Sequence, residues 1–120
     1  MVNQSIIETA EQFASLIPSN LMVKKAFLFG SYAKGSEKEE SDIDIAIVLG
    51  NMPDFFEAQT QLMRVRREVD LRIEPHPISE NEFNATNPFA LEIQRTGIEL
   101  TLNYQNQLAS EPTAEYGENK

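Results

Sequence analysis

The pattern of apolar and polar positions divides the chain into helical and extended segments. Apolar side chains recur at helical spacing over residues 3–17, which predicts an amphipathic helix. Residues 23–29 (VKKAFLF) and 42–48 (DIDIAIV) are apolar runs bounded by glycine-containing turns, which predicts two strands. The connection between these two strands is short, and its SYAKG segment suits a loop or a short helix.

The second half of the chain continues with the same two periodicities. Residues 54–67 return to helical spacing, and residues 68–75 (EVDLRIEP) predict a third strand that is stopped by two nearby prolines. A further helix is expected to begin near Pro88, a residue favoured in the first helical turn, and to end at Gly97. Residues 98–102 (IELTL) predict a final strand or extended segment.

This order of elements predicts an α+β fold, a small mixed sheet with helices packed on one face. The link between the second and third strands is long enough for a helical crossover, so that this pair can be parallel. The length of 120 residues fits one domain, which we place at residues 1–104. Residues 105–120 are polar and contain Pro, Gly and Glu, which predicts a disordered tail.

Composition narrows the classes of function. The apolar fraction is 41%, which is enough for a core, and the absence of cysteine excludes disulfides and thiolate metal sites. The chain shows no signal-like segment and no run long enough to span a membrane, so we expect a cytoplasmic protein without a membrane partner. The net charge of −9 argues against direct nucleic-acid binding but not against a nucleotide, because bound divalent cations reverse the local sign.

Two aspartates interrupt the second predicted strand. Side chains on a strand alternate between faces, so Asp42 and Asp44 share one face and three isoleucines share the other. Neighbouring carboxylates repel each other and are costly to bury unpaired, and a divalent cation such as Mg²⁺ or Mn²⁺ resolves both problems. Taken alone, the pair also fits turn chemistry at the start of a strand. If the third strand lies beside the second, Asp70 can join the pair, and three carboxylates can hold two metal ions for an in-line displacement.

The segment before these aspartates has the composition of an anion-binding loop. Gly30 directly follows an apolar strand, and glycine lets a backbone approach a phosphate closely. Ser31 adds a hydroxyl donor, and Lys34 adds a positive charge. An ordinary exit from a strand into a loop would look similar, and the spacing is not that of a P-loop.

Taken together, these residues resemble the signature of a known family. Gly30-Ser31, ten intervening residues and the pair Asp42 and Asp44 resemble the motif of the DNA polymerase β-type nucleotidyltransferases. The form GSYAKGSEKEESDIDIAIV is most similar to the minimal nucleotidyltransferase (MNT) group, and Asp70 falls where that family places its third carboxylate.

The resemblance implies a nucleotidyltransferase fold and a role for each matching residue. It implies two bound Mg²⁺ ions, with Mn²⁺ as an alternative, and transfer of a nucleotidyl group from ATP or another NTP to a hydroxyl with release of pyrophosphate. The implied nucleotide-binding residues are Gly30, Ser31 and Lys34, the last standing where many relatives carry Arg. The implied catalytic and metal-ligating residues are Asp42, Asp44 and Asp70, of which Asp70 would also help to activate the hydroxyl.

The resemblance also implies a partner. Many MNT proteins act as antitoxins beside a HEPN-domain protein, and some transfer AMP from ATP to a tyrosine of that toxin. A non-catalytic antitoxin that only binds the toxin is one alternative. A small-molecule nucleotidyltransferase, for instance of the aminoglycoside type, is another, although the short chain disfavours it because such enzymes generally carry an added helical domain.

Five further polar residues have more than one interpretation. Arg64, Arg66 and Arg67 predict a solvated helix face, with a partner or phosphate contact as the alternative. Arg72 is expected to pair with a nearby carboxylate or to lie near the nucleotide. His76, the only histidine, stands between two prolines and is interpreted as a surface loop residue rather than a general base.

Overall fold

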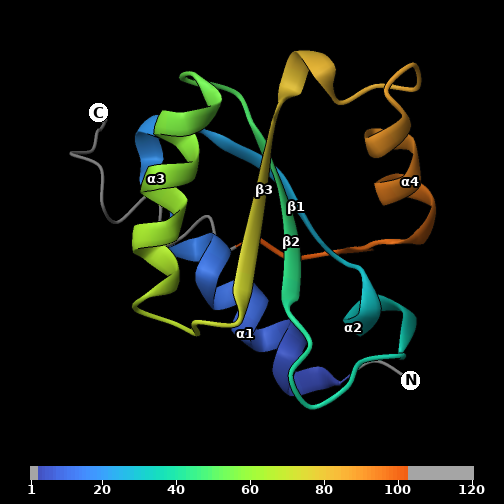
Figure 1. Ribbon diagram of the computed structural model, residues 1–120. Coiled ribbons are helices and arrows are strands. Elements are labelled where there is room, and N and C mark those ends of the chain that lie inside the picture. The colour runs from blue at the N-terminus through green and yellow to red at the C-terminus, as the bar shows by residue number, and fades with distance from the viewer. Residues whose placement is uncertain (1–2, 103–120) are drawn as a thin grey trace.

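The computed structural model describes residues 3–102 and shows a sheet between two layers of helix (Figure 1). The tail predicted for residues 105–120 lies outside the described residues. Within the described part, every helix is too short or too polar to span a membrane. Two short 3₁₀ turns, Ser19–Leu21 and Glu80–Glu82, flank the strands. The helices and strands are α1 (Gln4–Ser15), β1 (Val23–Phe29), α2 (Ser31–Lys34), β2 (Ile43–Leu49), α3 (Phe55–Arg66), β3 (Ile73–Ser79), α4 (Pro88–Thr96) and β4 (Ile98–Glu99).

The four strands form one mixed sheet in the order β3-β2-β1-β4. β1 is antiparallel to both β2 and β4, whereas β2 and β3 are parallel. The short link through α2 joins the antiparallel pair, and α3 supplies the crossover that a parallel pair requires. The predicted α+β fold with a mixed sheet is therefore confirmed.

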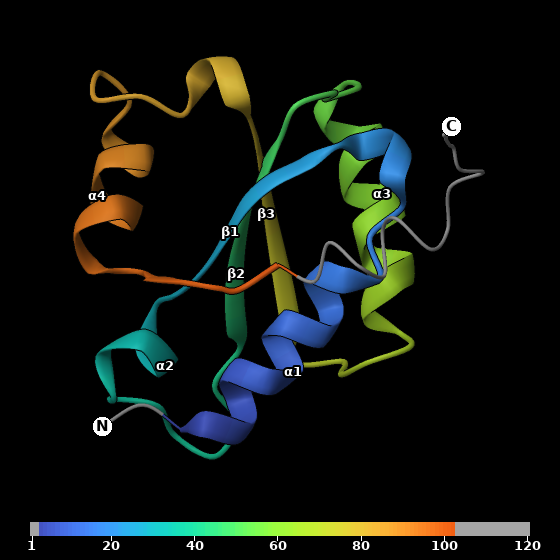
Figure 2. The same cartoon turned by 180° about the vertical axis from the view of Figure 1, so that it is seen from behind.

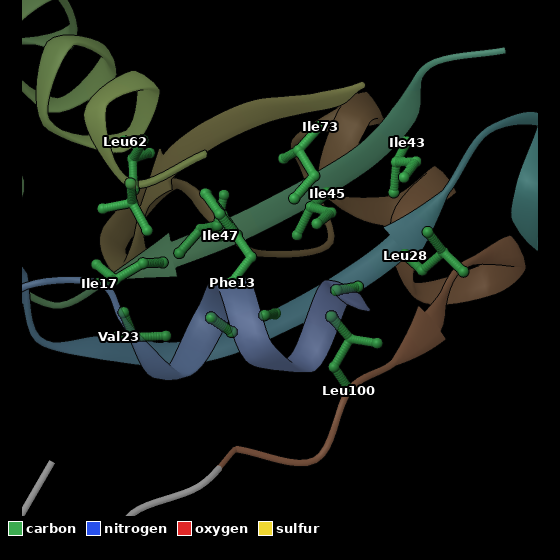
Figure 3. Packing of buried hydrophobic residues seen from close by; sticks show 14 of the residues in the cluster. Phe13, Ile17, Val23, Leu28, Ile43, Ile45, Ile47, Leu62, Ile73 and Leu100 are labelled. Atoms are coloured by element: carbon green, nitrogen blue, oxygen red, sulfur yellow. The ribbon is translucent and has the colours of Figure 1, made fainter. Parts of the chain in front are cut away.

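One face of the sheet is covered by α1 and α3 and carries the main apolar core (Figures 1 and 2). The isoleucines of β2 point into this core, as their alternation with the aspartates predicts, and each is fully buried. Figure 3 shows them packed with side chains of α1, α3 and the neighbouring strands. Prominent members are Phe13, Ile17, Val23, Leu28, Ile43, Ile45, Ile47, Leu62, Ile73 and Leu100.

The opposite face is only partly covered. The prediction of helices on one face describes α1 and α3, whereas α4 packs on the other side through Ala90 and Ile93. Its buried partners there are Phe27, Ala46, Val48 and Ile78. Because Asp42 and Asp44 precede Ala46 and Val48 on this same face, the acidic side chains lie next to the smaller apolar cluster rather than in the main core.

The predicted third strand is present, but its predicted bounds of 68–75 are wrong. β3 begins at Ile73, and it runs through both Pro75 and Pro77 instead of stopping at them. β3 is an edge strand, and an edge strand tolerates proline because the missing N–H can face away from the sheet. The shift places Asp70 in the turn before β3.

Side chains of helix α3 hydrogen-bond to backbone carbonyls on the outer edge of β3. Gln59 Nε2 donates to the carbonyl of Pro75 at 3.1 Å, and Arg66 Nη1 donates to the carbonyl of Ile73 at 3.1 Å. Arg66 is therefore half-buried and bonded to backbone, which corrects its interpretation as part of a solvated face. These contacts explain how a strand with two prolines is held in place.

Candidate active site

The site lies where β2 begins, on the face that α4 only partly covers. Asp42 directly precedes β2, and Asp44 is its second residue. Asp44 is paired with Phe29 of β1 on one side and with Glu74 of β3 on the other. Its side chain keeps 25% of its surface exposed, so it is accessible to a ligand while being held between two strands.

Glu74 is the third acidic residue that the structure brings to this pair. Its pKa is raised, mainly because its carboxyl shares a hydrogen bond with Asp42, and secondly because burial and the nearby negative charges disfavour ionisation. The predicted strand over residues 68–75 contains Glu74, but it was expected to bring Asp70 rather than Glu74 beside the aspartates.

Asp70 has different partners. Arg72 Nη2 donates to Asp70 Oδ2 at 2.8 Å, and Arg72 Nε and the backbone N–H of Arg72 both donate to Oδ1, at 3.1 and 2.9 Å. This pairing with Arg72 lowers the pKa of Asp70. Arg72 Nη1 also donates to the hydroxyl of Tyr32 at 3.2 Å, which connects the turn before β3 to α2. Both oxygens of Asp70 are thus committed to Arg72, and its role as a metal ligand stays a prediction.

The turn between β1 and α2 places the predicted phosphate-binding residues beside Asp44. Gly30 has φ +75° and ψ −151°, a backbone conformation that essentially only glycine adopts. A Cβ at this position would overlap Asp44 Oδ2. Ser31 follows as the half-buried first residue of α2, and Lys34 at its end is exposed. Glycine is therefore required here by the carboxylate beside it, independently of any phosphate.

His76 is a site residue that the sequence interpretation missed. It belongs to β3, and its ring Nε2 lies 3.2 Å from Asp44 Oδ1, so its interpretation as a surface loop residue is wrong. The ring packs edge-on against Phe29, with centroids 4.9 Å apart, and Phe89 of α4 lies beside both. The alternation of Glu74 and His76 would have indicated a shared face if β3 had been extended through its prolines.

The acidic side chains suit a hard divalent cation by their chemistry. Across residues 3–102, no three acidic or histidine side chains stand in the arrangement of a preformed metal site. Instead Asp42 raises the pKa of Glu74, and His76 Nε2 lies 3.2 Å from Asp44 Oδ1. A cation would offset the repulsion between these acids, and carboxylate oxygens are the ligands that Mg²⁺ and Mn²⁺ prefer.

The chain matches a known protein family and is similar to several named proteins. The family model described as "Polymerase beta, Nucleotidyltransferase" matches residues 11–106. A protein of Methanocaldococcus jannaschii named "Putative protein adenylyltransferase MJ0141" is 32% identical over 99 residues, which are 79% of this chain and 98% of that protein.

Two solved structures share the fold. A toxin–antitoxin crystal structure with AMP-PNP matches with a TM-score of 0.56 and 23% identity, over 89% of this chain and 80% of that chain. A mutant of the toxin–antitoxin pair MntA-HpeT matches with a TM-score of 0.54 and 20% identity, over 86% and 75% of the two chains. The resemblance noted from the residues of the motif is thereby confirmed.

Proposed function

Because the chain belongs to the polymerase β nucleotidyltransferase family and is a nucleotidyltransferase, we propose that it transfers AMP from ATP to a hydroxyl of a protein partner. The observation that carries the proposal is the meeting of Asp42, Asp44 and Glu74 beside the Gly30–Ser31 turn. This arrangement combines a cation-binding acidic cluster with a turn from which backbone and hydroxyl groups can contact phosphate.

We propose that Asp42, Asp44 and Glu74 hold Mg²⁺, with two ions as the family resemblance implies. Bound Mg²⁺ would supply Lewis-acid stabilisation of the negative charge on the transferring phosphoryl group. The family resemblance implied Asp70 for the third position. Glu74 fits this position better because it pairs with Asp44 across the sheet and lies beside Asp42. Asp70 instead forms an ion pair with Arg72.

The chain's own residues then account for binding and proton transfer. Gly30 and Ser31 would contact the triphosphate, and the exposed Lys34 can reach an outer phosphate as a point charge. The acceptor oxygen bonds to the α-phosphorus, the bond from that phosphorus to the bridging oxygen breaks, and pyrophosphate leaves. The hydroxyl proton passes to a carboxylate of the cluster, and we propose Glu74 as that acceptor.

The proposed acceptor is a tyrosine of a HEPN-domain toxin, which would make the chain an enzymatic antitoxin. The similarity to a toxin–antitoxin structure and to a protein named as an adenylyltransferase supports this proposal.

The test uses the full chain, Mg²⁺ and a candidate HEPN-domain toxin. We expect label from ATP carrying ³²P at the α-phosphate to enter the toxin, and label at the γ-phosphate to leave as pyrophosphate. Asp42→Asn with Asp44→Asn should abolish labelling. If none of the four nucleoside triphosphates labels the toxin, transfer to this partner is wrong. If the double variant still neutralises the toxin fully, neutralisation proceeds by binding alone.

A further inference from the structure

His76 is the one described side chain outside the acidic cluster that hydrogen-bonds a member of it. Its Nε2 approaches Asp44 Oδ1 at 3.2 Å. An ionised carboxylate can only accept, so Nε2 carries the hydrogen and donates it to Oδ1. The two oxygens of Asp44 are therefore not equivalent, because one is bonded to β3 and the other faces the turn at Gly30.

The His76 ring is itself held on three sides. Pro75 and Pro77 restrict the backbone on both sides of it, since proline locks its own φ. Phe29 of β1 packs edge-on against the His76 ring, with ring centroids 4.9 Å apart. The ring centroid of Phe89 in α4 lies 6.3 Å from that of His76. Phe29 and Phe89 also pack against each other at 5.6 Å. A ring fixed by three elements can impose one orientation on the carboxylate that it bonds.

We propose that His76 is a positioning residue, which holds Asp44 with Oδ2 turned toward the Gly30–Ser31 turn. This inference rests on the proposed function in so far as Asp44 is a ligand of the divalent cation. A carboxylate that is free to rotate would lose entropy on binding the cation, and hydrogen bonds from outside the ligand set commonly remove that cost. Nothing in the proposal requires His76 to touch the nucleotide or the reacting atoms.

Two substitutions separate the hydrogen bond from the packing of the ring. His76→Phe keeps an aromatic ring against Phe29 and Phe89 but cannot donate to Asp44. His76→Gln removes the ring but places an amide N–H where Nε2 stands. If the hydrogen bond matters, Gln should behave like the native residue and Phe should not. If packing matters, the order should be reversed.

The experiment measures the binding of Mn²⁺ to the full chain without nucleotide. Electron paramagnetic resonance detects the Mn²⁺ that stays free in solution. We expect His76→Phe to weaken Mn²⁺ binding by about tenfold, the lower end for residues that orient ligands, and His76→Gln to stay within about threefold of the native chain. Thermal unfolding without metal should show that both variants fold. In the transfer assay, the loss in His76→Phe should be recovered by raising Mg²⁺, with kcat nearly restored.

Three results distinguish the proposals. Native-like Mn²⁺ binding by His76→Phe overturns the positioning role and leaves the proposed function intact. Equal weakening in both variants also overturns it, because restoring the donor in His76→Gln would then not restore Mn²⁺ binding. Failure of the native chain to bind Mn²⁺, together with the same failure in Asp44→Asn, overturns the cation site itself and with it the proposed function.

Discussion

Asp70 and Glu74 lie close together in the chain but in opposite electrostatic surroundings. Asp70 is matched by the guanidinium of Arg72, and its pKa is lowered. Glu74 stands beside Asp42, and its pKa is raised. A carboxylate paired with a cation stabilises the fold, whereas a carboxylate set next to another acid destabilises it unless a cation or a shared proton intervenes. Such a costly arrangement is typical of functional sites.

The largest expected effect is that of Glu74→Gln on the rate of transfer. Glu74→Gln should lower the rate of nucleotidyl transfer by about 10²–10⁴-fold, because it removes a ligand and a proton acceptor. The same change should not lower the free energy of unfolding measured in urea without metal, since it removes the repulsion between two neighbouring acids and the amide can donate to Asp42. Loss of function without loss of stability is the signature of a residue kept for chemistry.

Asp70→Asn is the matched control for that experiment. Transfer should stay within about threefold of the native rate, whereas the free energy of unfolding should fall. If Asp70→Asn abolishes transfer in a folded protein and Glu74→Gln does not, the assignment of the third carboxylate returns to Asp70, as the family resemblance implies.

Gly30→Ala tests the close contact between the Gly30 turn and Asp44 of the acidic cluster. The positive φ and the overlap of a Cβ with Asp44 Oδ2 should together lower the free energy of unfolding by about 2 kcal/mol or more. Gly35→Ala is the matched control, because Gly35 has nearly the same φ of +74° but a left-handed helical ψ of 19°. It should cost about 1 kcal/mol and leave Mn²⁺ binding unchanged. If Gly30→Ala and Gly35→Ala changed Mn²⁺ binding equally, the contact between residue 30 and Asp44 would be contradicted.

The ion pair between Asp70 and Arg72 should make stability depend on pH in the acid range. Because the folded-state pKa of Asp70 lies below its ordinary value of 3.8, its contribution is present above that pH and is lost as pH falls through the folded pKa. Asp70→Asn should therefore cost about 1 kcal/mol near neutral pH, as expected for a hydrogen-bonded, partly exposed ion pair. Urea unfolding of both proteins should converge as pH is lowered. A constant difference at all pH values would show that charge is not the cause.

The smallest expected effect tests the connection from Arg72 to α2. Tyr32→Phe removes the hydroxyl that accepts from Arg72 but keeps the buried ring. Because Arg72 stays paired with Asp70, the free energy of unfolding should fall by only about 0.5 kcal/mol. A double-mutant cycle of Tyr32→Phe with Asp70→Asn should show coupling, since both partners fix one guanidinium. Strict additivity would indicate that the two contacts act independently.

Local patterns predicted most of the elements and part of the site. The alternation in DIDIAIV separated the buried isoleucines from the aspartates, and β1 has the predicted bounds of 23–29. Asp42, Asp44 and the Gly30–Ser31 turn could be predicted because they lie close in sequence on two neighbouring strands. Glu74 was inside the predicted strand, but local patterns gave no register and Asp70 was expected in its place. His76 lay beyond the predicted end, because a local rule treats proline as the end of a strand.

The sequence by itself thus determined the strand periodicity, the family motif and the acidic pair, because each depends only on residues near one another in the chain. The tertiary structure alone decided which further carboxylate joins the pair. That choice depends on the parallel register of β2 and β3, and on Gln59 and Arg66 of α3, which bond the outer edge of a proline-containing strand. Register and edge contacts are long-range interactions, so no local pattern could place Glu74 opposite Asp44 and leave Asp70 to Arg72.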